Sequence, residues 1–346
     1  MKKIFFLLSF AAIHISYGQD VHFSQFYMSP LSLNPGLTGA EHDLTTTLNY
    51  KSQWSSVAVP FNTMAFGYDM RLNKSRQSKG FLAMGVNFFS DKSGDAKLAT
   101  SQGDLLVAYH VRVNASSTFG GGVSAGFGQR NINFSGLKWG TQYDGTTYNG
   151  TLLSGEPASG TSSLSYLDLG GGLDWNYDDR SGSKNVTDNH DSRFNIGLGV
   201  WHVNQPKYSF YGSNEKLYMK YVVHGTGTFS IGGSNVAICP GFMYSRQGPS
   251  QEIYAGGLMR FVLAQDSKYT GFKQGAAISF GAFVRAQDAV AATVLVEYAN
   301  YSLGMSYDVN TSSLTAASNA KGGFEIALRF VTPNPFATKT TSSFFN

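Results

Sequence analysis

The feature that most constrains this chain is an alternation of large apolar residues with small or polar ones at a period of two. It is clearest in residues 301–308, YSLGMSYD, where every odd position is large and apolar and every even position is small or polar. Residues 63–71, 193–200 and 323–330 repeat the pattern. Because successive side chains of a β-strand point to opposite faces, the alternation specifies strands with one apolar and one polar face.

Two architectures share this pattern. A soluble antiparallel sandwich or barrel turns the apolar face inward, whereas a membrane barrel turns it outward to lipid and keeps a polar lumen. Strand length favours the membrane barrel, because the patterns over 102–113, 118–130, 251–261 and 275–285 reach the roughly 9 to 11 residues that a tilted membrane strand needs. Aromatic residues also gather at the predicted strand ends, as in an interfacial girdle. They are Tyr50, Trp54, Phe88, Phe89, Trp175, Tyr177, Tyr298 and Tyr301. The composition agrees, since 40 Gly, 26 Phe and 19 Tyr with only 14% charged residues suit many strands joined by turns.

We therefore predict an all-β fold, a transmembrane antiparallel β-barrel of about 14 strands with an N-terminal plug or strap. The predicted strands cover residues 43–52, 62–71, 80–90, 101–113, 118–130, 163–177, 192–203, 219–231, 235–245, 251–262, 275–286, 289–299, 301–309 and 322–332. With a periplasmic N-terminus, connections after odd-numbered strands face outward and should be longer. The two longest, 131–162 and 204–218, obey this rule. Segments 178–191 and 263–274 break it, so either the strand count is off by one or these periplasmic loops are lengthened.

The first 18 residues resemble a secretory signal peptide. They carry Lys2 and Lys3, an apolar run over 4–13 and small residues before a cleavage point near Gly18. The run is shorter than the roughly 20 residues of a spanning helix, which disfavours a retained anchor. We expect the mature chain in the outer membrane as a multi-pass protein. The single cysteine, Cys239, excludes an internal disulfide framework and a Cys-based zinc site.

Residues 19–42 form a strap that precedes the alternating region. Its two prolines remove ladder donors and restrict the residues before them, so the strap must be held by something other than a sheet. We expect it to lie in or over the barrel lumen, with its aromatic side chains against inward glycines such as Gly120 and Gly122. Two roles remain open, a seal that stabilises the barrel and a direct contact with a partner. The strap residues singled out are His22, Phe23, Ser24, Gln25, Phe26, Tyr27, Pro30, Asn34, Pro35 and Gly39.

Charged residues of both signs fall on the polar face of the predicted strands. They are Lys51, Asp69, Arg71, Arg112, Arg193, Arg260, Arg285, Glu297, Asp308, Glu325 and Arg329. Buried charges need partners or water, so these residues indicate either a salt-bridged, filled interior or a selective aqueous pore. The filled interior is favoured, because a barrel of this size commonly holds a plug and the strap can supply one.

Catalytic patterns are not found. No histidines stand at helical metal-ligand spacing, so satisfied lumen or loop histidines are the better interpretation. The glycines at 120–122, 126 and 128 fail the spacing of a nucleotide loop, and close approach of another backbone in the lumen explains them better. No Ser/His or carboxylate pair is evident. We predict no enzymatic activity, no cofactor and no metal, and the scattered net charge of +4 gives no indication of nucleic-acid binding.

The outward segments are the candidate partner-binding surface, because loops on a rigid scaffold carry binding residues and aromatics dominate protein contacts. The alternative is a flexible lid. The candidate residues are Trp139, Tyr143, Tyr148, Tyr208 and Tyr211.

Several separated motifs resemble, in order and spacing, the PorP/SprF family of outer-membrane proteins of the Bacteroidetes type IX secretion system. They are HFSQFYMSPLSLNPGLTGA at 22–40, NYKSQW at 49–54, FFSDKSGDAKL at 88–98, AGFGQRNINFSGLKWG at 125–140, GVWHVNQP at 199–206, SYDVNTSSL at 306–314 and GGFEIALRF at 322–330. The resemblance covers essentially the whole mature chain.

This resemblance implies a non-enzymatic outer-membrane barrel of the secretion and gliding apparatus. It implies that the barrel supports secretion or surface anchoring of a large adhesin through the adhesin's C-terminal sorting domain, together with periplasmic envelope proteins. A channel or transporter for a small solute is the alternative function. The expected organisation is a signal peptide at 1–18, the strap at 19–42, the barrel at 43–332 and a tail at 333–346.

Overall fold

The structure is a computed structural model. It describes residues 20–57, 59–72, 79–134, 137–155, 161–179, 192–210, 214–232, 234–265, 274–313 and 315–332. The predicted signal peptide, the tail at 333–346 and Tyr211 lie outside the described residues.

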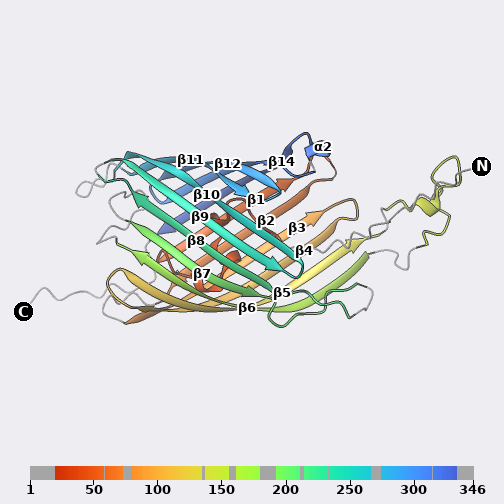
Figure 1. Ribbon diagram of the computed structural model, residues 1–346. Helices are drawn as coiled ribbons and strands as arrows, with labels where there is room; N and C mark the ends of the chain where they lie inside the picture. The colour runs from red at the N-terminus through yellow and green to blue at the C-terminus, as the bar shows by residue number, and fades with distance from the viewer. Residues whose placement is uncertain are drawn as a thin grey trace, which may run out of the picture.

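The described residues form a closed antiparallel barrel of 14 strands, which confirms the predicted fold (Figure 1). Each strand pairs with its neighbours in the chain, and β1 closes the barrel on β14 with Leu44 opposite Thr332. The strands are β1 (Leu44–Gln53), β2 (Phe61–Arg71), β3 (Gly80–Ser93), β4 (Leu98–Arg112), β5 (Ser117–Asn133), β6 (Thr161–Asp178), β7 (Arg193–Trp201), β8 (Lys220–Ser230), β9 (Val236–Gln247), β10 (Ser250–Ala264), β11 (Ala276–Arg285), β12 (Ala289–Tyr298), β13 (Tyr301–Asn310) and β14 (Lys321–Thr332).

The helical elements are short. They are η1 (Phe26–Met28), α1 (Pro30–Leu33), η2 (Pro35–Leu37), η3 (Gly140–Gln142) and α2 (Thr315–Ser318). Among the described residues, no helix is long and apolar enough to cross a membrane.

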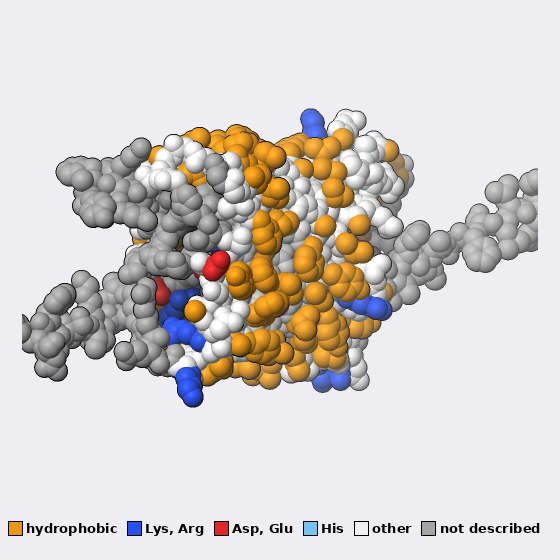
Figure 2. All heavy atoms as spheres, turned by 60° about the vertical axis from the view of Figure 1, so that its left-hand side comes forward, with side chains coloured by type: hydrophobic (Ala, Val, Ile, Leu, Met, Phe, Trp, Pro, Cys, Tyr) orange, Lys and Arg blue, Asp and Glu red, His pale blue; other side chains and the backbone are white. Residues whose placement is uncertain are grey.

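The apolar face of the wall is the outer one. In β13, Tyr301 is 52% exposed and Met305 is 38% exposed, whereas their neighbours Ser302 and Ser306 are each 3% exposed. The same alternation runs through β4 and β5, and Figure 2 shows the apolar side chains gathered in a belt with Lys and Arg side chains near its margins. This orientation agrees with a lipid-facing barrel and excludes the soluble alternative, whose apolar face would be buried.

The barrel has two unlike ends. We call the end where β1 begins and β14 finishes the terminal end, and the opposite one the long-loop end. The long-loop end carries the segments 134–160 and 202–219, both of which follow odd strands as predicted. Because the count of 14 strands holds, the segments 179–192 and 265–275 are true connections at the terminal end and not the sign of a missed strand.

Several strands run further than predicted, among them β3 to Ser93, β4 from Leu98 and β10 to Ala264. β5 continues to Asn133, past its predicted end at 130, and β6 begins at Thr161, before its predicted start at 163. Apart from Ile132, the outermost residues of β5 and β6 are polar on both faces, so the period-two signal fades there although the ladder continues. β7 ends earlier than predicted, at Trp201, because His202 adopts a positive φ of 57° that turns the chain out of the strand.

The strap runs along the inside of the barrel from the long-loop end to the terminal end (Figure 1). Its first described residue, Asp20, contacts Gln247 at the end of β9, and Gly39 contacts Asp69 near the end of β2. Asn34, which precedes Pro35, is extended, with φ −158° and ψ 120°, but the prolines themselves are not. Each instead starts a single helical turn, because a proline at the first position of a turn loses no internal hydrogen bond.

Inward glycines make room for the strap backbone, though they differ in part from the expected ones. A Cβ on Gly122 would collide with the backbone of Pro35 and Gly36, so this glycine serves the expected purpose. Gly120 does not, since a Cβ there would meet Asp174 and His110 of the wall. The strap aromatics pack elsewhere, on β10 and β11, because the strap reaches β5 only after its aromatic residues have passed.

The close approach at Gly122 gives a test. Gly122→Ala should destabilise the barrel by about 1–3 kcal/mol, because the strap backbone has no flexible group that could yield to the methyl. Gly171→Ala is the matched control, since its Cβ would make only an ordinary contact of 3.6 Å. Urea unfolding in detergent, followed by heat-modifiable mobility on gels, measures both. Equal midpoints for the two variants would contradict the packing described.

Candidate functional site

The strap is anchored near the long-loop end by a buried carboxylate. Glu325 on β14 accepts hydrogen bonds from two consecutive strap amides, Ser24 N–H at 2.6 Å and Gln25 N–H at 2.9 Å. The Ser24 hydroxyl donates to Asp308 on β13 at 2.7 Å. Ser24, Gln25 and Glu325 are all almost completely buried. The wall thus satisfies strap backbone groups that no strand pairs with.

Paired cations balance these carboxylates. Arg285 lies 3.1 Å from Asp308, 3.1 Å from Glu252 and 2.7 Å from Asp288. Lys51 lies 3.8 Å from Asp308 and donates to the His22 carbonyl at 3.2 Å. Burial, with the nearby cations, lowers the pKa of His22 well below its usual value, so this histidine is neutral.

Aromatic side chains hold the middle of the strap. Phe26 meets Tyr254 of β10 and Phe283 of β11 edge to face, each at 5.7 Å between ring centroids. Tyr27 stacks on Phe283 at 5.5 Å. Phe26 is 1% exposed and belongs to the core cluster with Leu31, Leu33 and Leu37. The lumen therefore contains an apolar core between two polar layers.

Asn34 fixes the next part of the strap to β6 and β8. Its Oδ1 accepts from Gly36 N–H at 2.8 Å, and its Nδ2 donates to the Leu173 carbonyl at 2.8 Å and lies 3.1 Å from His224 Nε2. The side chain sits where a Cβ on the wall glycines Gly172 or Gly197 would be. A larger residue at those positions would displace Asn34.

Near the terminal end, Asp69 and Arg71 of β2 hold the strap from both sides. Asp69 accepts from Gly39 N–H at 2.8 Å, and Arg71 donates to the carbonyls of Gly39 and Ala40 at 2.6 Å each. Gly39 has a φ of +67°, which an L side chain rarely adopts. Phe81 packs under two guanidinium groups, with Arg71 at 4.5 Å and Arg112 at 5.4 Å from its centroid.

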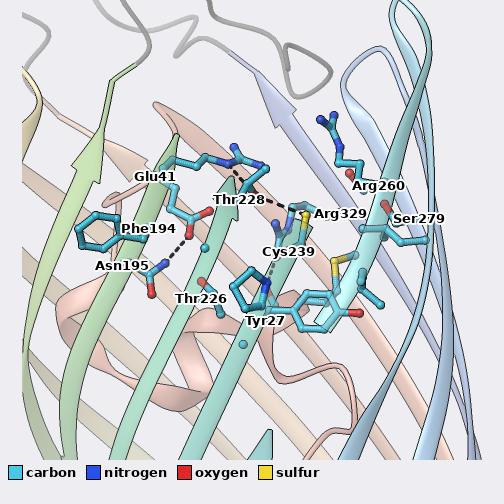
Figure 3. Close-up of a pocket in the computed structure, with 18 of the residues that line it drawn as sticks. Tyr27, Glu41, Phe194, Asn195, Thr226, Thr228, Cys239, Arg260, Ser279 and Arg329 are labelled. Carbon is cyan, nitrogen blue, oxygen red and sulfur yellow. Dashed lines mark hydrogen bonds between the residues drawn. The ribbon is translucent and has the colours of Figure 1, made fainter. Parts of the chain in front are cut away.

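A cavity of about 130 Å³ opens beside the strap toward the terminal end (Figure 3). The apolar part of its lining consists of Tyr27, Phe283 and Leu258. The cationic part consists of Arg193, Arg260 and Arg329. These cations are engaged: Arg260 lies 2.5 Å from Glu297, Arg193 donates to Thr228 at 3.4 Å, and Arg329 donates to the Tyr27 carbonyl. In Figure 3, Glu41 of the strap faces Asn195 of β7, which donates to it at 2.7 Å.

The long-loop end also holds a clamp, which we define as Asp20, Asp168 and His202. His202 Nε2 lies 2.6 Å from Asp20, and its Nδ1 lies 2.8 Å from Asp168 on β6. Burial alone lowers the pKa of His202, but the two carboxylates outweigh burial and raise this pKa from 6.5 to about 9. Burial also disfavours the charged form of Asp20 and by itself would raise the pKa of this carboxyl. The nearby His202 and Lys220 outweigh burial, so the pKa of Asp20 lies below its usual value.

The exposed loop of the long-loop end comprises the described residues 134 and 137–155. Tyr143 and Tyr148 face each other across an isolated β-bridge and are 59% and 43% exposed. Hydrogen bonds from the Thr147 and Thr146 amides lower the pKa of Asp144 in the turn between them. Leu153 is 89% exposed.

Two further candidate partner-binding residues, Trp139 and Tyr208, are less exposed than Tyr143 and Tyr148. Trp139 is half-buried next to η3. Tyr208 packs under the Arg130 guanidinium at 4.3 Å and against Tyr166 at 5.5 Å, so it lines the inner side of the wall and not the exposed loop.

The sequence interpretation did not single out Asp20, Asp168 and His202 as a cluster. Three buried histidines, His110, His202 and His224, are hydrogen-bonded as expected for lumen histidines. Inward parity on the alternating strands would have identified Asp168 as a lumen residue. In the described part of the chain, no three His, Cys, Asp or Glu residues are grouped to hold a metal ion.

Removing the aromatic anchor should weaken the barrel itself. Phe26→Ala is expected to cost about 3–5 kcal/mol of unfolding free energy, because the core cluster loses its central ring. Phe26→Leu, the matched control, should cost less, since much of the apolar volume is kept. Unfolding in urea measures both. A normally stable Phe26→Ala barrel would argue that the strap does not support the wall.

The clamp predicts a pH dependence. The folded-state pKa of His202 lies above its unfolded value of 6.5, so the contribution of the clamp is fully present below about pH 6.5 and is lost as the pH rises through 9. The loss should approach about 3 kcal/mol in the wild type and be absent in His202→Gln. Hydrogen exchange of the amides near Asp20, compared between the two proteins from pH 6 to pH 10, measures it. Parallel pH profiles would contradict the assignment.

Comparisons with solved structures find other barrels at low similarity. The CymD monoaromatic hydrocarbon channel is 12% identical with a TM-score of 0.42, covering 89% of this chain and 93% of its own. BamA from Haemophilus ducreyi is 8% identical with a TM-score of 0.42, covering 84% and 71%. The translocator domain of the autotransporter NalP from Neisseria meningitidis is 9% identical with a TM-score of 0.38, covering 84% and 87%.

A search among curated proteins found no match. The family comparison, in contrast, matches nearly the whole chain. Residues 15–330 match the family described as "Type IX secretion system membrane protein PorP/SprF". This span includes the strap and every strand except the last residues of β14. The chain therefore belongs to the PorP/SprF family of type IX secretion system membrane proteins.

Proposed function

We propose that this barrel anchors a large secreted adhesin at the cell surface by binding the adhesin's C-terminal sorting domain at the long-loop end. The observation that carries the proposal is the exposure of Tyr143, Tyr148 and Leu153 on a loop beyond the apolar belt. Aromatic and apolar side chains held on an ordered loop are the residues that protein contacts use most. Membership of a secretion-system family supports a protein partner.

In this proposal the long-loop end faces outward and the terminal end faces the periplasm. Outer-membrane barrels carry their longer loops outside and their shorter turns inside, and the long segments 134–160 and 202–219 share one end. The described ends of β6, β7, β10 and β11 at the terminal end then face the periplasm, where secretion or envelope proteins can bind.

The strap serves as a seal in this proposal. Carboxylates, arginines and aromatic rings of the wall contact it at successive levels of the lumen, its own Asn34 bonds β6 and β8, and most of its residues are buried. A segment bound by that many wall residues suits a permanent filling better than a mobile partner-binding arm. The filled, ion-paired interior is the form of lumen that these contacts support.

Passage or binding of a small solute is the second candidate. The cavity of about 130 Å³ at the terminal end favours it, because it combines apolar wall with polar groups. Solute uptake or planar-bilayer conductance that disappears when Arg193 and Arg260 are replaced would support this candidate over anchoring.

The anchoring proposal is tested in cells. Tyr143→Ser combined with Tyr148→Ser should shift the adhesin from the cell surface to the medium, lowering the attached amount about tenfold, because two exposed anchors are lost. Thr146→Ala with Thr147→Ala is the matched control, since it keeps both turn amides that bond Asp144. Surface labelling and blotting of cells and medium give the readout. Full attachment of the adhesin after deletion of the whole gene would sink the proposal.

A further inference from the structure

The barrel wall has a step between β6 and β7. β6 pairs with β5 along its whole length, from Ser117 opposite Tyr177 to Asn133 opposite Thr161. It pairs with β7 only between Gly171 opposite Val200 and Asp178 opposite Arg193. Residues 161–170 of β6 therefore rise beyond the end of β7 at the long-loop end, where Figure 1 shows β5 and β6 reaching further than β7.

Asn204 ends the pairing just above β7. The Val203 amide donates to the Leu169 carbonyl at 3.0 Å, and Asn204 Oδ1 accepts from Leu169 N–H at 3.2 Å. Asn204 Nδ2 then donates to the Leu167 carbonyl at 2.7 Å. This side chain takes the place of one more strand residue. Beyond it the chain turns away at Gln205, whose φ is 43°.

The remaining edge of β6 is open. The contacts of Leu167 and Leu169 show that odd residues of β6 direct their N–H and C=O groups toward the β7 side, and the same direction recurs every second residue. The backbone N–H and C=O groups of Thr161, Ser163 and Ser165 therefore also point toward the β7 side. Within the described residues, no hydrogen bond reaches their backbone groups from that side. We call residues 161–167 the open edge, which ends at the Leu167 carbonyl that Asn204 caps.

Beyond Leu167, the outward side chains of the open edge are polar, and the edge lacks the usual protection. On the outer face of β6 the apolar series ends at Leu167, and the next outward residues are Ser165 and Ser163. Unpaired edge strands are usually guarded by lysine, proline or inward charges, because they pair readily with other chains. The open edge, TSSLSYL, contains no proline and no charged residue. It can therefore accept a further strand.

We propose that the open edge of β6 binds an extended strand of the secreted partner's C-terminal domain by strand addition. The inference rests on the proposed anchoring function and names the surface that performs it. The inner face of the edge carries Tyr166, next to Tyr208 and Arg130, and the outer face carries serines. The added strand should alternate accordingly, with apolar side chains toward Tyr166 and polar ones outward.

A second copy of the chain fits this edge less well. Two barrels in one membrane have parallel axes, so their β6 strands point in the same direction and could pair only in parallel. Their lumen faces would then lie on opposite sides of the joint, and the inner and outer faces of the two strands would not match. A partner in solution is free to approach antiparallel, in the more stable arrangement.

The test uses prolines that remove only the open donors. Ser163→Pro with Ser165→Pro deletes two edge N–H groups, whereas the ladder to β5 uses the even residues and keeps its donors. Ser163→Ala with Ser165→Ala is the matched control, since it removes both hydroxyls and keeps both N–H groups. The probe is the purified C-terminal domain of a secreted adhesin, titrated onto the full-length barrel in nanodiscs. We expect binding about tenfold weaker for the proline variant and unchanged for the alanine variant.

The outcomes separate the two proposals. If the domain does not bind the wild-type barrel, the anchoring function fails. If it binds the wild-type and a correctly folded proline variant equally, only the strand addition fails. Hydrogen exchange of the wild type provides a measurement that needs no variant, with slower exchange of residues 161–167 expected when the domain is added. Unchanged exchange there, or a disulfide-linked homodimer of Ser165→Cys in a Cys239→Ser background, overturns the inference.

Discussion

A barrel of fourteen strands encloses more space than its own inward side chains fill, and the structure depends on how that space is occupied. The strap occupies it, and the wall is shaped to receive the strap. Gly122, Gly172 and Gly197 leave room for backbone and for Asn34. Phe26 fills the middle. Wall and strap are therefore one packing unit, and neither is complete without the other.

Electrostatics follow from the same constraint. A strap without a strand partner presents bare amides and carbonyls in a lumen where such groups are costly to leave unpaired. Charged side chains of the wall pair with these groups. Glu325 accepts hydrogen bonds from two strap amides, and Arg71 donates to two strap carbonyls. The wall charges are in turn paired with one another, as Arg285 and Lys51 are with Asp308. Breaking one contact leaves a buried charge uncompensated, so the strap contacts and the ion pairs of the wall depend on one another.

Because the strap occupies much of the lumen, the proposed partner contacts fall at the rim of the barrel. At the long-loop end, the surfaces that the described residues offer a secreted partner are the exposed loop with Tyr143 and Tyr148 and the open edge of β6. Both belong to the tall side of the barrel, formed where β5 and β6 extend beyond β7. A secretion-family barrel thus combines an interior built for stability with one raised side suited to protein contact.

The sequence alone determined the strands, their number and the face each residue takes, because a period of two is a local property of an extended chain. It also identified the strap and the charged residues of the lumen. Tertiary structure decided what these groups meet. Asp20 and His202 are far apart in the chain, and the strap aromatics met Phe283 and not Gly120, because contacts across a lumen depend on strand register and on the path of the strap. The open edge was hidden for the same reason: it arises from unequal lengths of neighbouring strands, and no pattern within β6 records where β7 ends.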